Sequence, residues 1–68
     1  MSVYKVIELI GTSNKSWEDA AASAVATARE SVRDLRVAEV MKQDLDIGDD
    51  GGLTYRTKLS VSFKYENP

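Results

Sequence analysis

Residues 53–65 read LTYRTKLSVSFKY, and apolar or aromatic side chains occupy every second position from Leu53 to Tyr65, with Thr57 as the one interruption. The positions between them are polar or charged. Successive side chains of a β-strand point to opposite faces, so this alternation is typical of a strand with one buried and one polar face. We therefore predict a long strand over residues 53–65.

A turn and a second strand precede this segment. Residues 48–52 read GDDGG, and glycine and aspartate adopt positive φ at low cost, which favours a tight hairpin turn. Residues 36–47 read RVAEVMKQDLDI and are predicted to form the antiparallel partner strand. The apolar side chains of this strand change parity between Ala38 and Met41, which indicates a bulge or a strong bend.

The first strand is predicted over residues 3–10, which read VYKVIELI. Apolar side chains occupy both parities of this segment, and only Lys5 and Glu8 interrupt them. A strand that is apolar on both faces is normally buried on both faces. Because one helix covers only one face of a sheet, we expect a second copy of the chain to cover the other.

The segment between the first two strands predicts one helix. Residues 11–16 are interpreted as a loop, and Ser16 is suited to cap a helix over residues 17–34. The backbone amides of such a loop could hold a phosphate, but the sequence is not a Walker motif and a plain connection is the favoured interpretation. Apolar residues recur at 3.6-residue spacing, at Trp17, Ala20, Ala21, Ala24, Val25, Ala28, Val32 and Leu35.

Together these segments predict one α+β domain over residues 1–68, a three-stranded antiparallel sheet curled around one helix in β-α-β-β order. Thirteen extended residues span ~43 Å whereas an 18-residue helix spans ~27 Å, so the hairpin is longer than the helix that covers it. Domains of about 60 residues bury only ~60% of their unfolded surface and are marginally stable alone. We therefore expect the chain to self-associate.

The composition excludes several classes of protein and site. The chain has no cysteine and no histidine, which excludes disulfides and removes the commonest transition-metal ligand and general base. The formal net charge is −2, so we expect no nucleic-acid partner. The sequence shows neither an apolar run of the ~20 residues that a membrane span needs nor a signal peptide, which favours a cytoplasmic protein without a membrane partner. Without a nucleophile–base pair, we expect no enzymatic activity.

The acidic residues suggest one kind of site. Residues 44–51 resemble a calcium loop, but an EF-hand needs glycine at its sixth position and glutamate at its twelfth, where this chain has Asp49 and Tyr55. An acidic hairpin tip is the favoured interpretation of that segment. In an oligomer, however, carboxylates could converge on a symmetry axis and bind a hard cation such as calcium or magnesium. The candidate ligands are Glu8, Asp44, Asp46 and, with less support, Glu39.

The sequence resembles the dodecin family over nearly its whole length. The resemblance rests on VYKVIELIGTS at residues 3–13, ATARESVRDL at 26–35, VAEV at 37–40 and TYRTKLSVSFKYE at 54–66. It implies a hollow homododecamer, and family members store flavins and carry ions at symmetry axes. The chain is most similar to a branch that lacks the flavin-stacking tryptophan and is associated with calcium.

The resemblance also identifies two positions of a degenerate flavin pocket. Val37 stands where flavin-binding dodecins have the stacking tryptophan, and Arg56 stands where they have a glutamine that hydrogen-bonds the ring edge. Valine offers no aromatic face, and arginine donates hydrogen bonds but accepts none. A non-catalytic shell that binds divalent cations is therefore favoured over a riboflavin or FMN storage protein, and a shell without a ligand is the third alternative. The colour of the purified protein and metal analysis of the oligomer distinguish the three.

Overall fold

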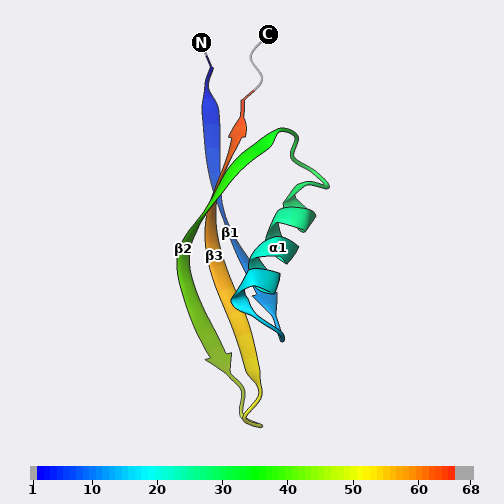
Figure 1. Ribbon diagram of the computed structural model, residues 1–68, viewed down its shortest axis with the longest axis vertical. Coiled ribbons are helices and arrows are strands. Elements are labelled where there is room, and N and C mark those ends of the chain that lie inside the picture. The colour runs from blue at the N-terminus through cyan, green and yellow to red at the C-terminus, as the bar shows by residue number, and fades with distance from the viewer. Residues whose placement is uncertain (1, 66–68) are drawn as a thin grey trace.

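The computed structural model describes residues 2–65 and contains three strands and one helix in the predicted order (Figure 1). The elements are β1 (Tyr4–Ser13), α1 (Trp17–Ala28), β2 (Leu35–Ile47) and β3 (Leu53–Lys64). The strands form one antiparallel sheet in the order β1-β3-β2, so the strand with the clearest alternation lies in the middle. The predicted α+β fold is confirmed. No helix among the described residues is long and apolar enough to cross a membrane.

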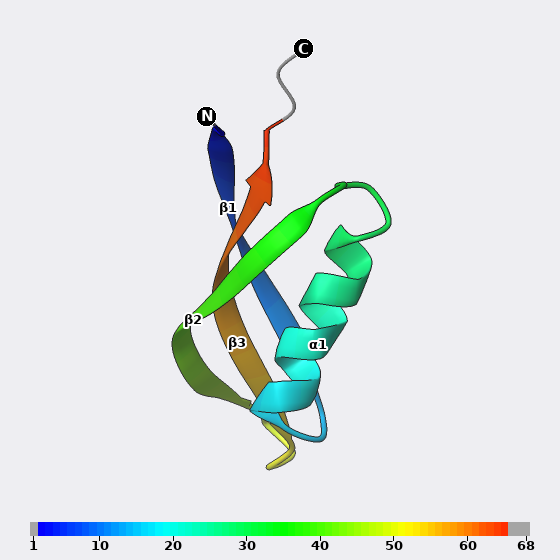
Figure 2. The same cartoon turned by 45° about the horizontal axis from the view of Figure 1, so that its top comes forward.

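The hairpin of β2 and β3 follows the predicted turn and bulge. Gly51 has a φ of 85°, and its amide donates to the carbonyl of Gly48 at 2.9 Å, which closes the turn. The register of β2 against β3 shifts between Val40 and Lys42, within the segment where the apolar pattern changes parity. A second shift lies between Leu35 and Val37, which the sequence pattern did not predict. The bulges bend β2, and Figure 2 shows this strand crossing over the sheet towards α1.

The first strand is longer than predicted. The pattern ended it at residue 10 and assigned residues 11–16 to a loop, but β1 continues to Ser13 and pairs with β3 as far as Tyr55. The loop interpretation was therefore wrong for residues 11–13. Gly11 is the physical reason that the signal was missed. It is a strand residue that leaves room for the helix backbone, because a Cβ at this position would overlap the carbonyl oxygen of Ala20.

The helix is shorter than predicted. It begins at Trp17, where the side chain of Ser16 accepts from the amide of Asp19 at 2.9 Å, but it ends at Ala28 rather than Asp34. After Ala28 the spacing of the hydrogen bonds becomes mixed: the amides of Glu30 and Ser31 donate to carbonyls three residues back, of Thr27 and Ala28, and the amide of Val32 donates to the carbonyl of Ala28. Asp34 then takes a φ of 58°, which turns the chain into β2. The apolar spacing continues past this point, to Val32 and Leu35, which are partly buried although neither is helical.

The core lies between α1 and the middle of the sheet, and it is small. Leu59 and Val61 of β3 are 1% exposed, and the only other buried apolar side chains among the described residues are Ala20 and Ala28 of α1. Small alanine side chains let the helix approach the sheet closely. Large apolar side chains remain exposed on both faces elsewhere, including Ile47 at 71% and Val6 at 59%. Domains of this size are marginally stable alone, and this chain leaves much of its apolar surface exposed.

The shape of the chain also shows that the helix covers only part of the sheet. Its principal extents are 52 × 20 × 15 Å, and the β2–β3 hairpin continues well past the start of α1 (Figure 1). The predicted mismatch between the hairpin and the helix is present and is larger than expected, because the helix has 12 residues. Leu53 and Ile47 near the tip are exposed, because they lie on the helix side of the sheet but beyond the end of α1. No part of the described chain covers them.

Thr57 interrupts the apolar face of β3 for a reason that the structure supplies. Its side chain is fully buried, and the hydroxyl donates to the backbone carbonyl of Trp17 at 2.9 Å. We expect Thr57→Val to lower the free energy of unfolding by about 1–2 kcal/mol, because it removes a buried hydrogen bond at nearly constant volume. Thr54→Val, on the face away from the helix, should change it by less than about 0.5 kcal/mol. Equal urea midpoints for the two variants would contradict this assignment.

Candidate functional site

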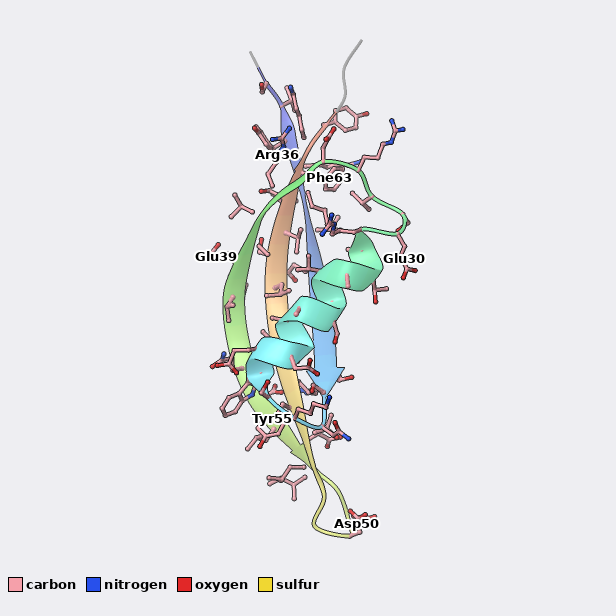
Figure 3. All side chains as sticks on the ribbon, turned by 45° about the vertical axis from the view of Figure 1, so that its right-hand side comes forward. Glu30, Arg36, Glu39, Asp50, Tyr55 and Phe63 are labelled. Carbon is pink, nitrogen blue, oxygen red and sulfur yellow. The ribbon has the colours of Figure 1, made fainter. Side chains whose placement is uncertain are left out.

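The candidate site lies on the face of the sheet opposite α1, which we call the open face. Directly paired residues of an antiparallel sheet point to the same side, so the pairing register defines this face. In Figure 3, Glu39 projects from β2 away from the helix. All four acidic candidates and both flavin-pocket positions lie here. The open face includes Val6, Glu8, Ile10, Val37, Glu39, Lys42, Asp44, Asp46, Arg56, Lys58, Ser60 and Ser62.

Asp44 and Arg56 form the best-defined interaction of the open face. They are direct cross-strand partners in β2 and β3. Arg56 Nε donates to Asp44 Oδ1 at 2.7 Å, and Arg56 Nη2 donates to Asp44 Oδ2 at 2.9 Å. This two-pronged geometry matches the planar guanidinium to the carboxylate and is the strongest form of such a pair. Both carboxylate oxygens of Asp44 are therefore occupied within one chain.

The ion pair affects the protonation of Asp44. The hydrogen bonds from Arg56 lower the pKa of the Asp44 carboxyl below its usual 3.8, and the charges of Arg56 and Lys42 lower it further. Desolvation opposes this shift, but it does not reverse its direction. The same pair raises the pKa of Arg56. Asp44 is consequently ionised over the whole physiological range and carries the charge that a cation ligand needs.

The remaining charges of the open face surround this pair. Lys58 Nζ lies 3.4 Å from Glu8 Oε1, and Lys42 is the direct partner of Lys58 across β2 and β3. A shallow pocket of about 160 Å³ is lined by Ile10, Lys42, Asp44, Arg56 and Lys58. Two of the predicted ligands, Glu8 and Asp44, are thus each paired with a cation from β3.

The structure brings two of the predicted metal ligands close together. Asp44 and Asp46 are two residues apart on one strand, about 6.6 Å between Cα atoms, and both point to the open face. Glu8 and Glu39 both pair with Ser60, which is four residues or about 13 Å along β3 from Arg56. Calcium–oxygen distances are only ~2.3–2.6 Å. Within residues 2–65, no three acidic side chains of one chain are grouped to hold a metal ion.

The two flavin-pocket positions, Val37 and Arg56, are also far apart within one chain. Val37 is 62% exposed and pairs with Ser62, which is six residues or about 20 Å along β3 from Arg56. One flat ring cannot contact both side chains of a single chain. A pocket that used both positions would take Val37 from one subunit and Arg56 from another.

The sequence interpretation missed the contacts of Asp44 and of the single tryptophan. The ion pair could have been found by counting outward from the Gly48–Gly52 turn, since Ile47 faces Leu53 and Asp44 then faces Arg56. The contact of Trp17 had no local signal. Its indole Nε1 donates to the carbonyl of Asp44 at 2.9 Å, and its ring is nearly perpendicular to that of Tyr55, with the ring centroids 5.2 Å apart. This hydrogen bond fixes the backbone of Asp44 from the helix side.

We expect the lowered pKa of Asp44 to be visible in solution. Because the folded-state pKa lies below the unfolded value near 3.8, the ion pair stabilises the fold above that value and loses its effect as the pH falls through the folded-state pKa. A carboxyl carbon titration by NMR should show Asp44 titrating below pH 3.8 in the wild type and at a higher pH in Arg56→Gln. An identical Asp44 titration in both proteins would show that the pair does not form.

Comparison with known proteins places this geometry in context. A family model described as Dodecin matches residues 3–66. "Calcium dodecin" from Mycobacterium tuberculosis is 62% identical over 64 residues, which cover 94% of this chain and 90% of that protein. "Dodecin" from Thermus thermophilus is 41% identical over 64 residues, covering 94% and 93%. The crystal structure of the M. tuberculosis protein, described as calcium-chelating with a novel calcium-binding site, superposes with a TM-score of 0.89 at 58% identity, covering 98% of this chain and 99% of that one.

Proposed function

This chain belongs to the dodecin family, and from that premise we propose that it forms a non-catalytic homododecameric shell that binds divalent cations, calcium above all, at acidic sites between subunits. The observation that carries the proposal is the set of carboxylates on the open face, in a chain 62% identical to a protein named calcium dodecin. The chain has no histidine and no cysteine. The side chains that could bind a metal ion therefore offer oxygen ligands, and these favour calcium or magnesium over zinc or copper.

Self-assembly is supported by the apolar surface that one chain leaves open. Val6, Ile10 and Val37 of the open face are each about 60% exposed, and Ile47 near the hairpin tip is 71% exposed. Only two side chains larger than alanine are both apolar and buried among the described residues. Association with further copies would bury these surfaces, and folding would then depend on the concentration of the protein.

The spacing of the carboxylates supports a cation site that needs more than one copy. Asp44 and Asp46 lie two residues apart on the open face, about 6.6 Å between Cα atoms, while Glu8 lies too far along the same sheet to join them. A calcium ion takes six to eight oxygen ligands, more than this pair of residues supplies. We therefore assign Asp44 and Asp46 of one subunit to the centre of the site, with Glu8 and Glu39 available from neighbouring subunits.

Calcium titration of the assembled particle tests this assignment. After exhaustive dialysis against a chelator, isothermal titration calorimetry with calcium chloride should show saturable uptake by the wild type. Asp44→Asn combined with Asp46→Asn should weaken the affinity at least about tenfold, because calcium affinity depends on the number of charged ligands.

Asp49→Asn combined with Asp50→Asn is the matched control, since it removes the same charge at the hairpin tip. Asparagine keeps the oxygen with which Asp50 accepts from the amide of Gly52 at 2.8 Å, so the turn should persist. The control should retain wild-type affinity. If the tip variant lost calcium uptake and the Asp44 and Asp46 variant kept it, the site would lie at the hairpin tip instead.

A further inference from the structure

We propose that the subunits join head to tail: the tip of the β2–β3 hairpin of one chain docks on a groove at the C-terminal end of α1 in the next chain. The hairpin tip comprises residues 47–53. The groove, which we call the arginine groove, is lined by Val25, Arg29, Val32, Arg33, Asp34 and Leu35. The proposal rests on the self-assembly in the proposed function, and it names the two surfaces that make one of the contacts between subunits.

The hairpin tip carries an apolar patch that its own chain leaves uncovered. Ile47 and Leu53 are direct cross-strand partners on the helix side of the sheet, and both are exposed because the hairpin continues past the start of α1 (Figure 1). Leu45 lies next to them on the same face and is exposed as well. Contiguous apolar side chains at an exposed position are typical of a contact with another protein.

The arginine groove offers an apolar floor with a charged rim. It lies where the chain leaves α1 and turns into β2, and its volume is about 620 Å³. Val25, Val32 and Leu35 line it and are only half-buried, so part of their apolar surface is accessible. Arg29 and Arg33 line it too and are exposed. Neither arginine forms an ion pair with any other of residues 2–65.

The charges of the two surfaces are opposite. Two arginines against one aspartate leave the lining of the groove with a net charge of +1. The turn of the hairpin contributes Asp49 and Asp50, which are exposed, and residues 43–55 include no basic residue. In the described part of the chain, neither aspartate forms an ion pair. Docking would place them against Arg29 and Arg33 beside the apolar contact, and complementary charges of this kind steer association and fix its register.

One chain cannot make this contact with itself. The carbonyl of Asp34, at the groove, accepts from the amide of Lys64 at 3.2 Å, and Lys64 lies eleven residues or about 36 Å along β3 from Leu53. The hairpin tip and the arginine groove are therefore at opposite ends of the chain (Figure 1). A contact between unlike surfaces of identical subunits closes into a ring when the rotation between them allows it. Such rings are suitable building units of a closed shell.

Cross-linking between the two surfaces tests the proposal directly, because the wild type has no cysteine. The assembled variant with Arg33→Cys and Asp49→Cys in one chain should form covalent dimers and larger species with a short bis-maleimide reagent. The two positions are too far apart within one chain to be linked, so every product joins different subunits. Each single variant, treated in the same way, should remain monomeric on a denaturing gel.

Charge reversal tests the role of the ion pairs. Arg33→Glu and Asp49→Lys should each raise the concentration at which half of the particles dissociate at least about tenfold, because like charges then meet. Both changes in one chain should return this concentration to within severalfold of the wild type, as measured by sedimentation of a dilution series. Lys15→Glu reverses a charge outside both surfaces and should behave like the wild type. Asp49→Asn combined with Asp50→Asn creates no repulsion and should stay assembled in the calcium titration.

The outcomes separate this contact from self-assembly as such. An assembled double-cysteine variant without cross-links would show that the hairpin tip docks elsewhere, and equal cross-linking of Asp49→Cys alone would show that two tips meet. A combined charge reversal that dissociates more readily than either single variant would also overturn the contact. Each of these results leaves the shell standing. A wild type that sediments as a monomer would overturn the self-assembly on which both proposals rest.

Discussion

Gly11→Ala should lower the free energy of unfolding by about 3 kcal/mol or more, at the upper end of the range for overpacked sites. Gly11 is buried in β1 beneath α1, and a Cβ there would overlap the carbonyl oxygen of Ala20 and lie 3.0 Å from the Cβ of Ala24. Both contacts belong to the helix, and the first is with its backbone, so no side-chain rotation relieves the overlap. The helix would have to move off the sheet and open the small core around Leu59.

Gly51→Ala is the matched control for Gly11→Ala. Gly51 has a φ of 85° in the hairpin turn, but a Cβ there would meet no heavy atom within 4 Å. This change should cost only the conformational penalty of about 1–2 kcal/mol. Urea unfolding followed by Trp17 fluorescence, at one protein concentration, compares the two variants. A smaller loss for Gly11→Ala than for Gly51→Ala would show that α1 does not sit directly on β1.

Val37→Trp combined with Arg56→Gln should create flavin binding in a protein that otherwise leaves flavin fluorescence almost unquenched at micromolar concentration. Aromatic stacking contributes ~1–3 kcal/mol per base in single-stranded nucleic-acid sites, so its loss at Val37 weakens flavin binding by roughly ten- to a hundredfold. Arg56 could still pair with a phosphate, so any residual affinity of the wild type should favour FMN over riboflavin. The double variant should bind riboflavin as a yellow, quenched complex.

The distance between the two positions adds a condition to this prediction. Val37 and Arg56 lie about 20 Å apart along one chain, so the new site should exist only in the assembled particle. Dissociation of the particle should release the flavin and restore its fluorescence. Val37→Leu combined with Arg56→Gln is the control without an aromatic ring and should stay colourless. Tight riboflavin binding by the wild type would contradict the interpretation of both positions.

Much of the fold could be predicted because its signals are local. The alternation of residues 53–65, the GDDGG turn and the parity change after Ala38 each reflect the chain's own geometry, and the structure confirms all three. The errors lie where tertiary contacts override local patterns. Gly11 extends β1 because the helix backbone packs against it, and the helix ends at Ala28 although the apolar spacing continues to Leu35.

The candidate site could be predicted only in part. The carboxylates were chosen by residue type, and the register places Glu8, Asp44 and Asp46 on one face of the sheet. Their role as metal ligands stays a prediction. The ion pairs depend on the register of the hairpin, which the sequence interpretation did not work out. The pairing of Asp44 with Arg56 was therefore missed. Trp17 contacts Asp44 from 27 residues away, and no spacing in the sequence indicates that hydrogen bond.

Native mass spectrometry of the purified protein, recorded after chelator treatment and again with added calcium, tests the central claim most directly because it counts subunits and ions together. The account predicts a particle of about twelve chains with little monomer, as for the oligomeric dodecin family, and a discrete mass increase from bound calcium that is lost in Asp44→Asn combined with Asp46→Asn. A folded monomer at micromolar concentration, or a particle whose mass does not change with calcium, would contradict it.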